Sequence, residues 1–313
     1  MCMKNKKNII IPLIVLFLLI SGFVGYKALK FVMEKYHYLR DKINEIDNVV
    51  TKNIRHYDFD YAWANGHEYV AHAFGGKGSK TYTNSLEAFE YNYELGHRVF
   101  EVDFDLSTDG VTICSHDEDY WRYIIGNENS DVEYSYGNFK STPLFNDYTP
   151  LDYKDVIDLL IQYPDIYIVT DTKYDDELSV YKQLGQLCAY AESKDASVLD
   201  RIIPQIYNKN MLDYVMNVHD FKSVIFTLYN IVWDKDDIAE YCMRSGVKFI
   251  TVSEGVIDSD VIAMWKAMGI RIAVHTVNEK EEAEDFFNKG VDLIYTDFLL
   301  PELKEETVEV EHE

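Results

Sequence analysis

Cysteine and proline are scarce in this sequence of 313 residues, which contains four cysteines and six prolines. The cysteines lie far apart, at positions 2, 114, 188 and 242. This spacing indicates neither a zinc knuckle nor a disulfide framework, and we expect small buried or inert thiols. The sequence also lacks low-complexity segments, and 47% of its residues are hydrophobic. These features are typical of a packed globular protein.

Basic residues are scarce beyond the N-terminal segment. Residues 1–42 contain eight Lys and Arg against two Asp and Glu, so the rest of the chain contains 22 basic and 52 acidic residues, a net charge of -30. A domain this acidic repels nucleic acid and anionic lipid headgroups through its long-range field, and we expect no nucleic acid partner. A phosphate-bearing substrate then needs a local positive centre, for which a metal ion is the natural candidate.

The sequence contains one long hydrophobic run, from Ile9 to Val24, which follows three lysines. About 18 apolar residues just span the hydrocarbon core of a bilayer, and the segment after the run is a poor cleavage site. We therefore expect a basic tail at 1–8, an uncleaved transmembrane signal anchor at 9–26 and a helical stalk or linker at 27–65. Lysines flank the run on both sides, so the loop charges leave its direction open. With the short tail inside, the chain is expected to be a single-pass cell-membrane protein whose catalytic domain is extracellular.

From residue 66 onward, short β-branched or aromatic runs alternate with amphipathic helical stretches. Strands are predicted at 68–73, 99–105, 167–173, 202–207, 223–228, 248–252, 271–277 and 293–296. Helices are predicted at 84–95, 153–162, 178–192, 211–218, 236–244, 261–268 and 279–288. Eight such units predict an α/β fold, a closed (β/α)8 TIM barrel over 66–301 followed by an acidic tail at 302–313.

The predicted barrel departs from simple alternation after its second strand. Residues 111–115 are expected to form a ninth short strand, which ends at His116. Residues 118–150 then form a long, mostly irregular stretch, and long loops after barrel strands usually line the active site.

Carboxylates recur at the ends of two predicted strands. Glu101 and Asp103 are two residues apart on a strand with apolar neighbours, so they point to the same side. Asp171 and Lys173 repeat this spacing on the next barrel strand. Hard oxygen ligands of this kind suit Ca²⁺ or Mg²⁺, and Lys173 is expected to contact a substrate phosphate. The alternatives are a solvated carboxylate pair and an ordinary internal ion pair.

Two histidines end strands near these carboxylates. His72 ends the first strand and His116 the short strand after Gly110, and histidine suits proton transfer near neutral pH. Asn84 is expected to cap the first helix, with Glu87 three residues on. The alternative is that Asn84 faces the site. Gln205 and His275 lie on later strands, where each is either a pocket residue or a satisfied core or rim residue.

These motifs together resemble the glycerophosphodiester phosphodiesterase family, within the wider group of phosphatidylinositol-phospholipase-C-like barrels. The resemblance runs from Tyr69 to Pro301. It covers His72, the helix start at 84–89, Glu101-x-Asp103, Thr108-Asp109-Gly110, His116-Asp117, Arg122, Gly126, Pro150-Leu151, Asp171-x-Lys173, Thr276-Val277-Asn278 and Thr296-Asp297.

The resemblance implies a (β/α)8 barrel in which two histidines act as general acid and base. It places a divalent ion on Glu101, Asp103 and Asp171, and phosphate contact on Lys173. The chain departs from the family pattern where Ala73 replaces the usual arginine after the first histidine and where Asp171 replaces glutamate. These departures bear on the substrate more than on the reaction type.

The expected function is metal-dependent cleavage of glycerophosphodiesters to glycerol phosphate and an alcohol. His72 and His116 would divide the proton transfers, while Lys173 and Arg122 help to stabilise phosphate charge. The expected substrate is a small-molecule or lipid-derived phosphodiester. The alternatives are a phospholipase that acts on intact lipid headgroups and a catalytically silent, membrane-anchored protein that binds a glycerophosphate polymer.

Overall fold

The computed structural model describes residues 54–126, 132–228 and 233–302. The predicted tail at 1–8, the predicted anchor at 9–26 and residues 27–53 of the predicted stalk lie outside these residues, as does nearly all of the predicted acidic tail. Among the described residues, no helix combines the length and the apolar character needed to cross a membrane.

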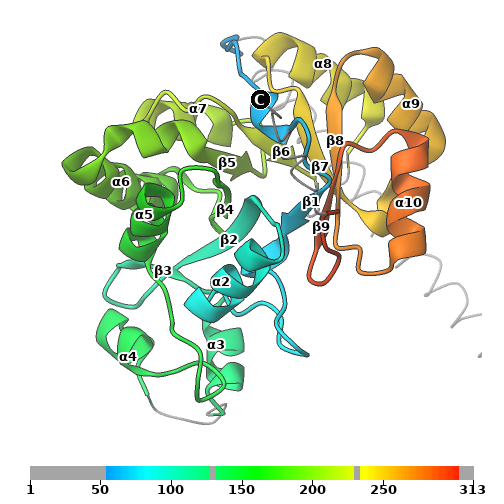
Figure 1. Ribbon diagram of the computed structural model, residues 1–313. Coiled ribbons are helices and arrows are strands. Elements are labelled where there is room, and N and C mark those ends of the chain that lie inside the picture. The colour runs from blue at the N-terminus through cyan, green and yellow to red at the C-terminus, as the bar shows by residue number, and fades with distance from the viewer. Residues whose placement is uncertain (1–53, 127–131, 229–232, 303–313) are drawn as a thin grey trace, which may run out of the picture. The chain divides into compact units, whose positions relative to one another are not determined.

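Eight parallel strands close into a barrel, which confirms the predicted fold class (Figure 1). They are β1 (Tyr69–Ala71), β2 (Val99–Leu106), β4 (Tyr167–Asp171), β5 (Ile202–Ile206), β6 (Ile225–Thr227), β7 (Phe249–Ser253), β8 (Arg271–His275) and β9 (Leu293–Thr296). The order runs β1-β9-β8-β7-β6-β5-β4-β2, and pairing of β1 with β2 closes the ring. Nearly every strand residue is buried because helices cover the outside of the barrel.

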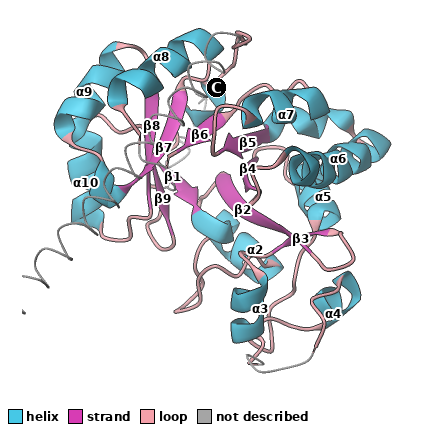
Figure 2. Ribbon diagram, turned by 180° about the vertical axis from the view of Figure 1, so that it is seen from behind, coloured by secondary structure: helices cyan, strands magenta, loops and turns pink. Residues whose placement is uncertain are grey.

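The helices lie around the strands, as Figure 2 shows from the opposite side. They are α2 (Leu86–Glu94), α5 (Tyr153–Gln162), α6 (Glu177–Lys194), α7 (Met211–Val218), α8 (Lys235–Ser245), α9 (Ser259–Ala267) and α10 (Lys280–Lys289). Side-chain caps fix several starts; Asp152 forms a capping box with Asp155 at the start of α5. Gly246 and Gly290 end α8 and α10 in the left-handed conformation, as their positions in the sequence predict.

The interior of the barrel is filled by apolar side chains that form one cluster. Its members are Trp63, Ala64, Val70, Val99, Val169, Ile203, Ile225, Phe249, Ala273, Leu293 and Tyr295. The Trp63 ring stacks on Phe249 with centroids 5.4 Å apart, and its Nε1 donates to Ser223 Oγ at 2.9 Å. Trp63 belongs to a short 3₁₀ turn, η1 (Ala62–Ala64).

The end of the predicted stalk therefore has a different structure from the one expected. Residues 55–61 form no α-helix. The amide of Tyr57 donates to the carbonyl of Ser245, and the amide of Asp60 donates to the carbonyl of Lys222. From Arg55 onward the chain forms one compact unit, so the barrel unit begins earlier than the predicted residue 66. The apolar residues Tyr57, Phe59, Tyr61 and Trp63 recur at every second position, which is not the spacing of a helix.

The segment between β2 and α5 leaves the barrel. It contains the predicted short strand β3 (Thr112–Cys114), which pairs antiparallel with β2, and the helices α3 (Glu118–Ile124) and α4 (Tyr136–Ser141). The last two lie beside β3 at the edge of the barrel in Figures 1 and 2. The expectation of a mostly irregular loop at 118–150 was thus partly wrong. A separate apolar cluster orders this segment: Ile113, Trp121, Ile124, Tyr134, Phe139, Leu144 and Tyr148.

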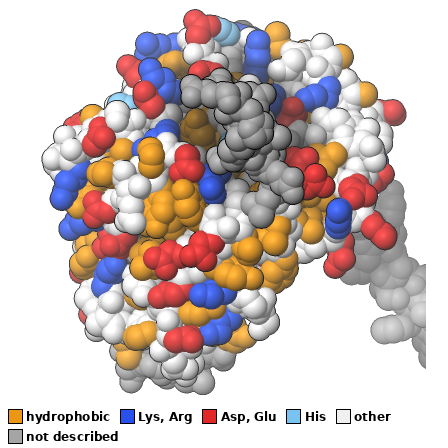
Figure 3. Space-filling view, viewed as in Figure 1, with side chains coloured by type: hydrophobic (Ala, Val, Ile, Leu, Met, Phe, Trp, Pro, Cys, Tyr) orange, Lys and Arg blue, Asp and Glu red, His pale blue; other side chains and the backbone are white. Residues whose placement is uncertain are grey.

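Acidic side chains are spread over the surface. On the face shown in Figure 3 they lie interspersed with lysine, arginine and hydrophobic side chains.

Candidate active site

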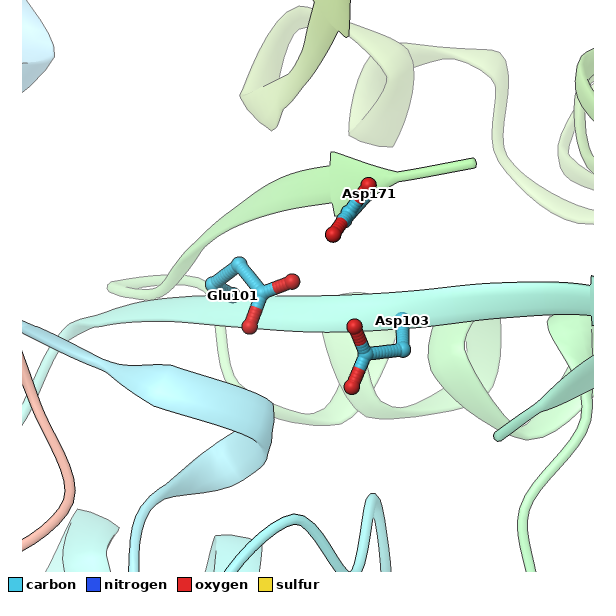
Figure 4. Close-up of side chains that lie close together, drawn as sticks. All are labelled: Glu101, Asp103 and Asp171. Atoms are coloured by element: carbon cyan, nitrogen blue, oxygen red, sulfur yellow. The ribbon is translucent and has the colours of Figure 1, made fainter. Parts of the chain in front are cut away.

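Three carboxylates meet at the carboxyl ends of neighbouring strands. Glu101 and Asp103 extend from β2, and Asp171 ends β4, as Figure 4 shows. The parallel register places Asp103 directly beside Asp171. One oxygen from each of the three carboxylates lies within 4.8 Å of the others. The i, i+2 spacing on β2 and the matching end of β4 are therefore sufficient to build the predicted cluster.

Burial makes this cluster electrostatically costly unless positive charge balances it. Burial and the charge of Asp103 raise the pKa of Glu101 to about 8. Burial also opposes ionisation of Asp103, but the Lys173 ammonium overcomes it and lowers the pKa of Asp103 to about 2. Lys173 Nζ contacts both Asp103 and Asp171, and the hydroxyl of Tyr207 donates to Asp171. Lys173 itself has a left-handed backbone, with φ of 57°.

Backbone and amide groups orient two of the carboxylates. The amide of Ala73 donates to Glu101 Oε2 at 2.7 Å. Asn84 Nδ2 donates to Asp103 Oδ2 at 2.8 Å, and its Oδ1 accepts the Asp103 amide at 3.0 Å. The expectation that Asn84 caps the first helix was therefore wrong, since Ser85 is the N-cap of α2. The partner predicted for the cap, Glu87, instead accepts from the amide of Thr149 at 2.7 Å.

His72 lies immediately after β1 and is held by a buried carboxylate. Its Nδ1 lies 3.0 Å from Asp297 Oδ1, and Asp297 is 7% exposed. Asn278 fixes that carboxylate, because its Nδ2 donates to Asp297 Oδ2 at 2.9 Å and its Oδ1 accepts the Asp297 amide at 2.8 Å. Burial alone would lower the pKa of His72, but the bond to Asp297 and the charges of Glu101 and Asp103 raise it to about 9.

His116 has a similar arrangement at the end of β3. Its Nδ1 lies 2.6 Å from Asp117 Oδ2. The other oxygen of Asp117 accepts the amide of Tyr120 at 2.6 Å and so caps α3. The helix thus fixes Asp117, and Asp117 in turn fixes His116. In both histidines a carboxylate engages Nδ1, which leaves Nε2 as the nitrogen available to a substrate.

One cavity of about 250 Å³ brings most of the predicted site residues together. Its lining consists of His72, Tyr82, Glu101, His116, Asp171, Lys173, Gln205, Thr227, His275, Thr276 and Tyr295. Gln205 accepts a hydrogen bond from Thr227 at 2.5 Å, and His275 Nε2 lies 3.0 Å from Ser253 Oγ. Burial and the nearby charge of His72 lower the pKa of His275 to about 4, so this histidine is neutral at physiological pH.

Arg122 is not among the residues that line this cavity. It lies on α3, where its guanidinium pairs with Glu118, with Nη2 and Oε1 2.6 Å apart. Its role as a phosphate ligand stays a prediction that the geometry does not support directly.

The donor set fits a divalent cation. All three groups are carboxylates, the ligand type that Ca²⁺ and Mg²⁺ prefer, and they approach one another closely enough to share an ion. The contacts of Lys173 with Asp103 and Asp171 show that this cluster attracts positive charge.

A closed parallel barrel with paired histidines and carboxylates at the carboxyl ends of its strands defines an enzyme of the TIM-barrel class. The family model for the glycerophosphoryl diester phosphodiesterase family matches residues 75–300. The chain therefore belongs to this family and is a phosphoric diester hydrolase.

Solved structures agree in fold at low sequence identity. A glycerophosphodiester phosphodiesterase from Parabacteroides distasonis superposes with a TM-score of 0.59 at 19% identity, over 74% of this chain and 92% of that one. A glycerophosphodiester phosphodiesterase from Thermotoga maritima superposes with a TM-score of 0.57 at 20% identity, over 74% of this chain and 96% of that one. An Oleispira antarctica phosphodiesterase, solved with its product sn-glycerol-3-phosphate, superposes with a TM-score of 0.59 at 16% identity, over 74% of this chain and 93% of that one. No protein with a curated description matches the sequence.

Sequence reasoning missed three residues of the site. Asp297 was recognised only as part of a closing motif, and its bond to His72 spans 225 positions. Tyr207 follows the strand of Gln205, and its hydroxyl donates to Asp171 across 36 positions. Tyr82 had no signal at all, since it lies in a loop without strand or helix periodicity and reaches the cavity only through a left-handed backbone, with φ of 56°.

Proposed function

We propose that the protein hydrolyses glycerophosphodiesters to glycerol phosphate and an alcohol, with a divalent cation bound by Glu101, Asp103 and Asp171. The observation that carries this proposal is the position of the two histidines. Each is held by a carboxylate at Nδ1, and both line the cavity that Glu101 and Asp171 of the carboxylate cluster also line. The product found in the Oleispira antarctica phosphodiesterase supports glycerol phosphate as a product here.

His72 and His116 would divide the proton transfers. One Nε2 accepts the proton of the attacking hydroxyl, which is either water or a neighbouring alcohol of the substrate. The other Nε2 donates a proton to the leaving alkoxide. Asp297 and Asp117 hold the two rings so that Nε2 is the reacting nitrogen, and Asp297 also stabilises the imidazolium form of His72.

The remaining residues would manage phosphate charge. When bound, a divalent cation neutralises part of the phosphodiester and stabilises the charge that builds on its non-bridging oxygens. Lys173 contributes a buried ammonium beside the same site. Burial alone would lower the pKa of Lys173, but the charges of Asp103, Asp171 and Glu101 raise it well above its usual value and keep the ammonium protonated. Because these charges lie in the cavity, they offset the repulsion between an anionic substrate and the acidic surface.

The test is turnover by the purified protein of a panel containing glycerophosphodiesters, lysolipids and phosphatidylinositol, with Ca²⁺ or Mg²⁺. Hydrolysis of glycerophosphodiesters is expected, together with its loss on chelation and in His116→Ala. Activity that survives chelation would refute the cation. Turnover confined to intact lipids would favour the phospholipase alternative, and turnover of any compound excludes a silent binding protein.

We also propose that residues 9–26 anchor the chain in the cell membrane with the barrel outside. The support is the length of the apolar run and the short basic tail before it. Full-length protein should sediment with membranes and resist extraction by alkaline carbonate, whereas a chain that begins at Arg55 should remain in the supernatant. Equal behaviour of the two chains would contradict the anchor, and protease digestion of intact cells reports the orientation.

A further inference from the structure

Tyr82 lies between the two histidines of the cavity. Its ring meets that of His72 edge to face, with centroids 4.5 Å apart, and that of His116 with centroids 5.7 Å apart. It also lines the cavity beside Glu101 and Lys173. A phosphodiester positioned for proton transfer by both histidines therefore has to lie against this tyrosine.

The backbone around Tyr82 is built to hold it there. Tyr82 and Asn84 both have left-handed backbones, with φ of 56° and 47°, and such strain in non-glycine residues is concentrated at functional sites. Asn84 is fixed by its paired bonds to Asp103. On the other side, the hydroxyl of Tyr120 donates to the carbonyl of Thr81 at 2.8 Å. The position of the ring is thus tied to a predicted metal ligand and to the helix that carries Asp117.

The hydroxyl of Tyr82 differs from those of four other tyrosines near the barrel mouth. Tyr120, Tyr134, Tyr174 and Tyr207 each donate to a carbonyl or carboxylate of the protein. Within the part of the chain that the structure describes, no such acceptor engages Tyr82. Burial and the charges of Asp297, Asp103 and Glu101 raise the pKa of Tyr82 to about 12, so its hydroxyl remains a donor through the physiological pH range.

The cavity also needs a further donor for an anion. Lys173 is its one lysine or arginine among the described lining residues, and this ammonium already contacts two carboxylates. The residue after His72 is Ala73, whose side chain has no donor and whose amide is used by Glu101. We propose that Tyr82 is a substrate-binding residue whose hydroxyl donates a hydrogen bond to a non-bridging oxygen of the phosphodiester. This inference rests on the function proposed above.

The test is Tyr82→Phe, which keeps the ring against both histidines and removes only the donor. The matched control is Tyr123→Phe, because Tyr123 lies on α3 with 57% of its surface exposed. In the presence of Ca²⁺, Tyr82→Phe should lower kcat/KM about 10- to 100-fold. It should also weaken the binding of inorganic phosphate at least about fivefold in a calorimetric titration. The melting temperature and Ca²⁺ affinity should stay at wild-type values, and Tyr123→Phe should match wild type throughout.

Wild-type kcat/KM and wild-type phosphate affinity in Tyr82→Phe would overturn the inference and leave the ring with a packing role only. The two proposals fail in different ways. Absence of diester turnover by the wild-type protein would refute the proposed function, and the phosphate titration would still decide whether the Tyr82 hydroxyl binds the anion.

Discussion

At the scale of single residues, the site depends on carboxylates that hold histidines. His72 and His116 are attached to the chain at strand ends, where a ring can rotate about its side-chain bonds. Asp297 and Asp117 remove that freedom, and Asp297 also favours the imidazolium form of His72. Asp297 is the more constrained of the two, because Asn278 holds both its other oxygen and its amide.

Replacement of Asp297 by Asn should therefore act on the chemistry through His72. We expect kcat to fall by about 10²- to 10⁴-fold, since an amide holds the ring less well and does not stabilise its positive charge. The pKa of His72 should fall from about 9, because the removed carboxylate favours the protonated form. Steady-state kinetics and NMR titration of the ring measure the two effects. Asp292→Asn is the control, because it makes the same substitution at a carboxylate that pairs with Lys266 and Arg271 and not with a histidine of the site. An unchanged pKa of His72 in Asp297→Asn would contradict the assignment.

The stability of the fold depends on pH through His97, whose pKa is lowered in the folded chain, whereas that of His72 is raised. It is 2% exposed, its Nε2 donates to the carbonyl of Leu299, and burial lowers its pKa from 6.5 to about 4. Between these two values the unfolded chain binds more protons at His97 than the folded chain does. Its contribution to stability is therefore fully present above pH 6.5 and is lost as the pH falls to 4.

The loss at His97 amounts to at most about 3 kcal/mol over this range. Denaturant unfolding at several pH values measures it, and His97→Gln, which removes the titrating group, should show a correspondingly smaller decline between pH 6.5 and 4. Parallel curves for the two proteins would show that His97 is not the group responsible.

At the scale of elements, alternation and periodicity were sufficient to predict the barrel. All eight predicted strands are present in the parallel sheet, and α5 and α7 have the predicted bounds. The exceptions occur where tertiary contacts override local preference. The first strand was predicted to reach residue 73 but ends at Ala71, because Ala73 and Phe74 adopt left-handed backbones that no local signal in these residue types predicts.

The same distinction applies to the site. The sequence spacing predicted the carboxylate cluster, since i, i+2 residues on a strand share a side and parallel strands end at one edge. Asn84 was misassigned because its preference for helix caps is a local property, whereas its partner Asp103 lies 19 positions away. Tyr82 and Asp297 likewise owe their positions to contacts between distant segments, which periodicity does not report.

The excursion of β3, α3 and α4 is stabilised by its own apolar cluster and carries His116 and Asp117 at its base. Trp121 is fully buried in that cluster, with its ring centroid 5.1 Å from that of Tyr134. Trp121→Ala should lower the free energy of unfolding of this segment by about 3 to 5 kcal/mol. The effect should be confined to the segment because its apolar cluster is separate from the barrel interior.

Hydrogen exchange measures that effect. It should accelerate at residues 118–126 and 132–148 in Trp121→Ala, while β5 to β9 retain their protection. Tyr123→Ala, on the exposed side of the same helix, should leave exchange unchanged. A uniform increase across the barrel would show that the excursion and the barrel unfold as one unit.

At the scale of the whole molecule, the active site lies at the carboxyl ends of the barrel strands. The floor of the barrel, by which we mean the amino ends of the same strands and residues 55–65, lies at the opposite end. The chain reaches β1 through residues 55–65, which cover the amino ends of the strands and place Trp63 on the interior core. His72 follows β1, and the three carboxylates extend from β2 and β4 toward the same end of the barrel. Changes at the floor can therefore alter stability without contacting the catalytic groups.

Trp63→Ala tests this division. Trp63 is 8% exposed and packs on Phe249 and Tyr167, so its truncation should lower the free energy of unfolding by about 3 to 5 kcal/mol. At temperatures where the variant is still folded, kcat should remain at the wild-type value. Leu178→Ala is the control, since that side chain is 76% exposed and its loss should change stability by less than about 0.5 kcal/mol. Equal unfolding curves for Trp63→Ala and wild type would mean that residues 55–65 lie outside the cooperative unit, and a chain that begins at residue 66 would then fold as well as one that begins at Arg55.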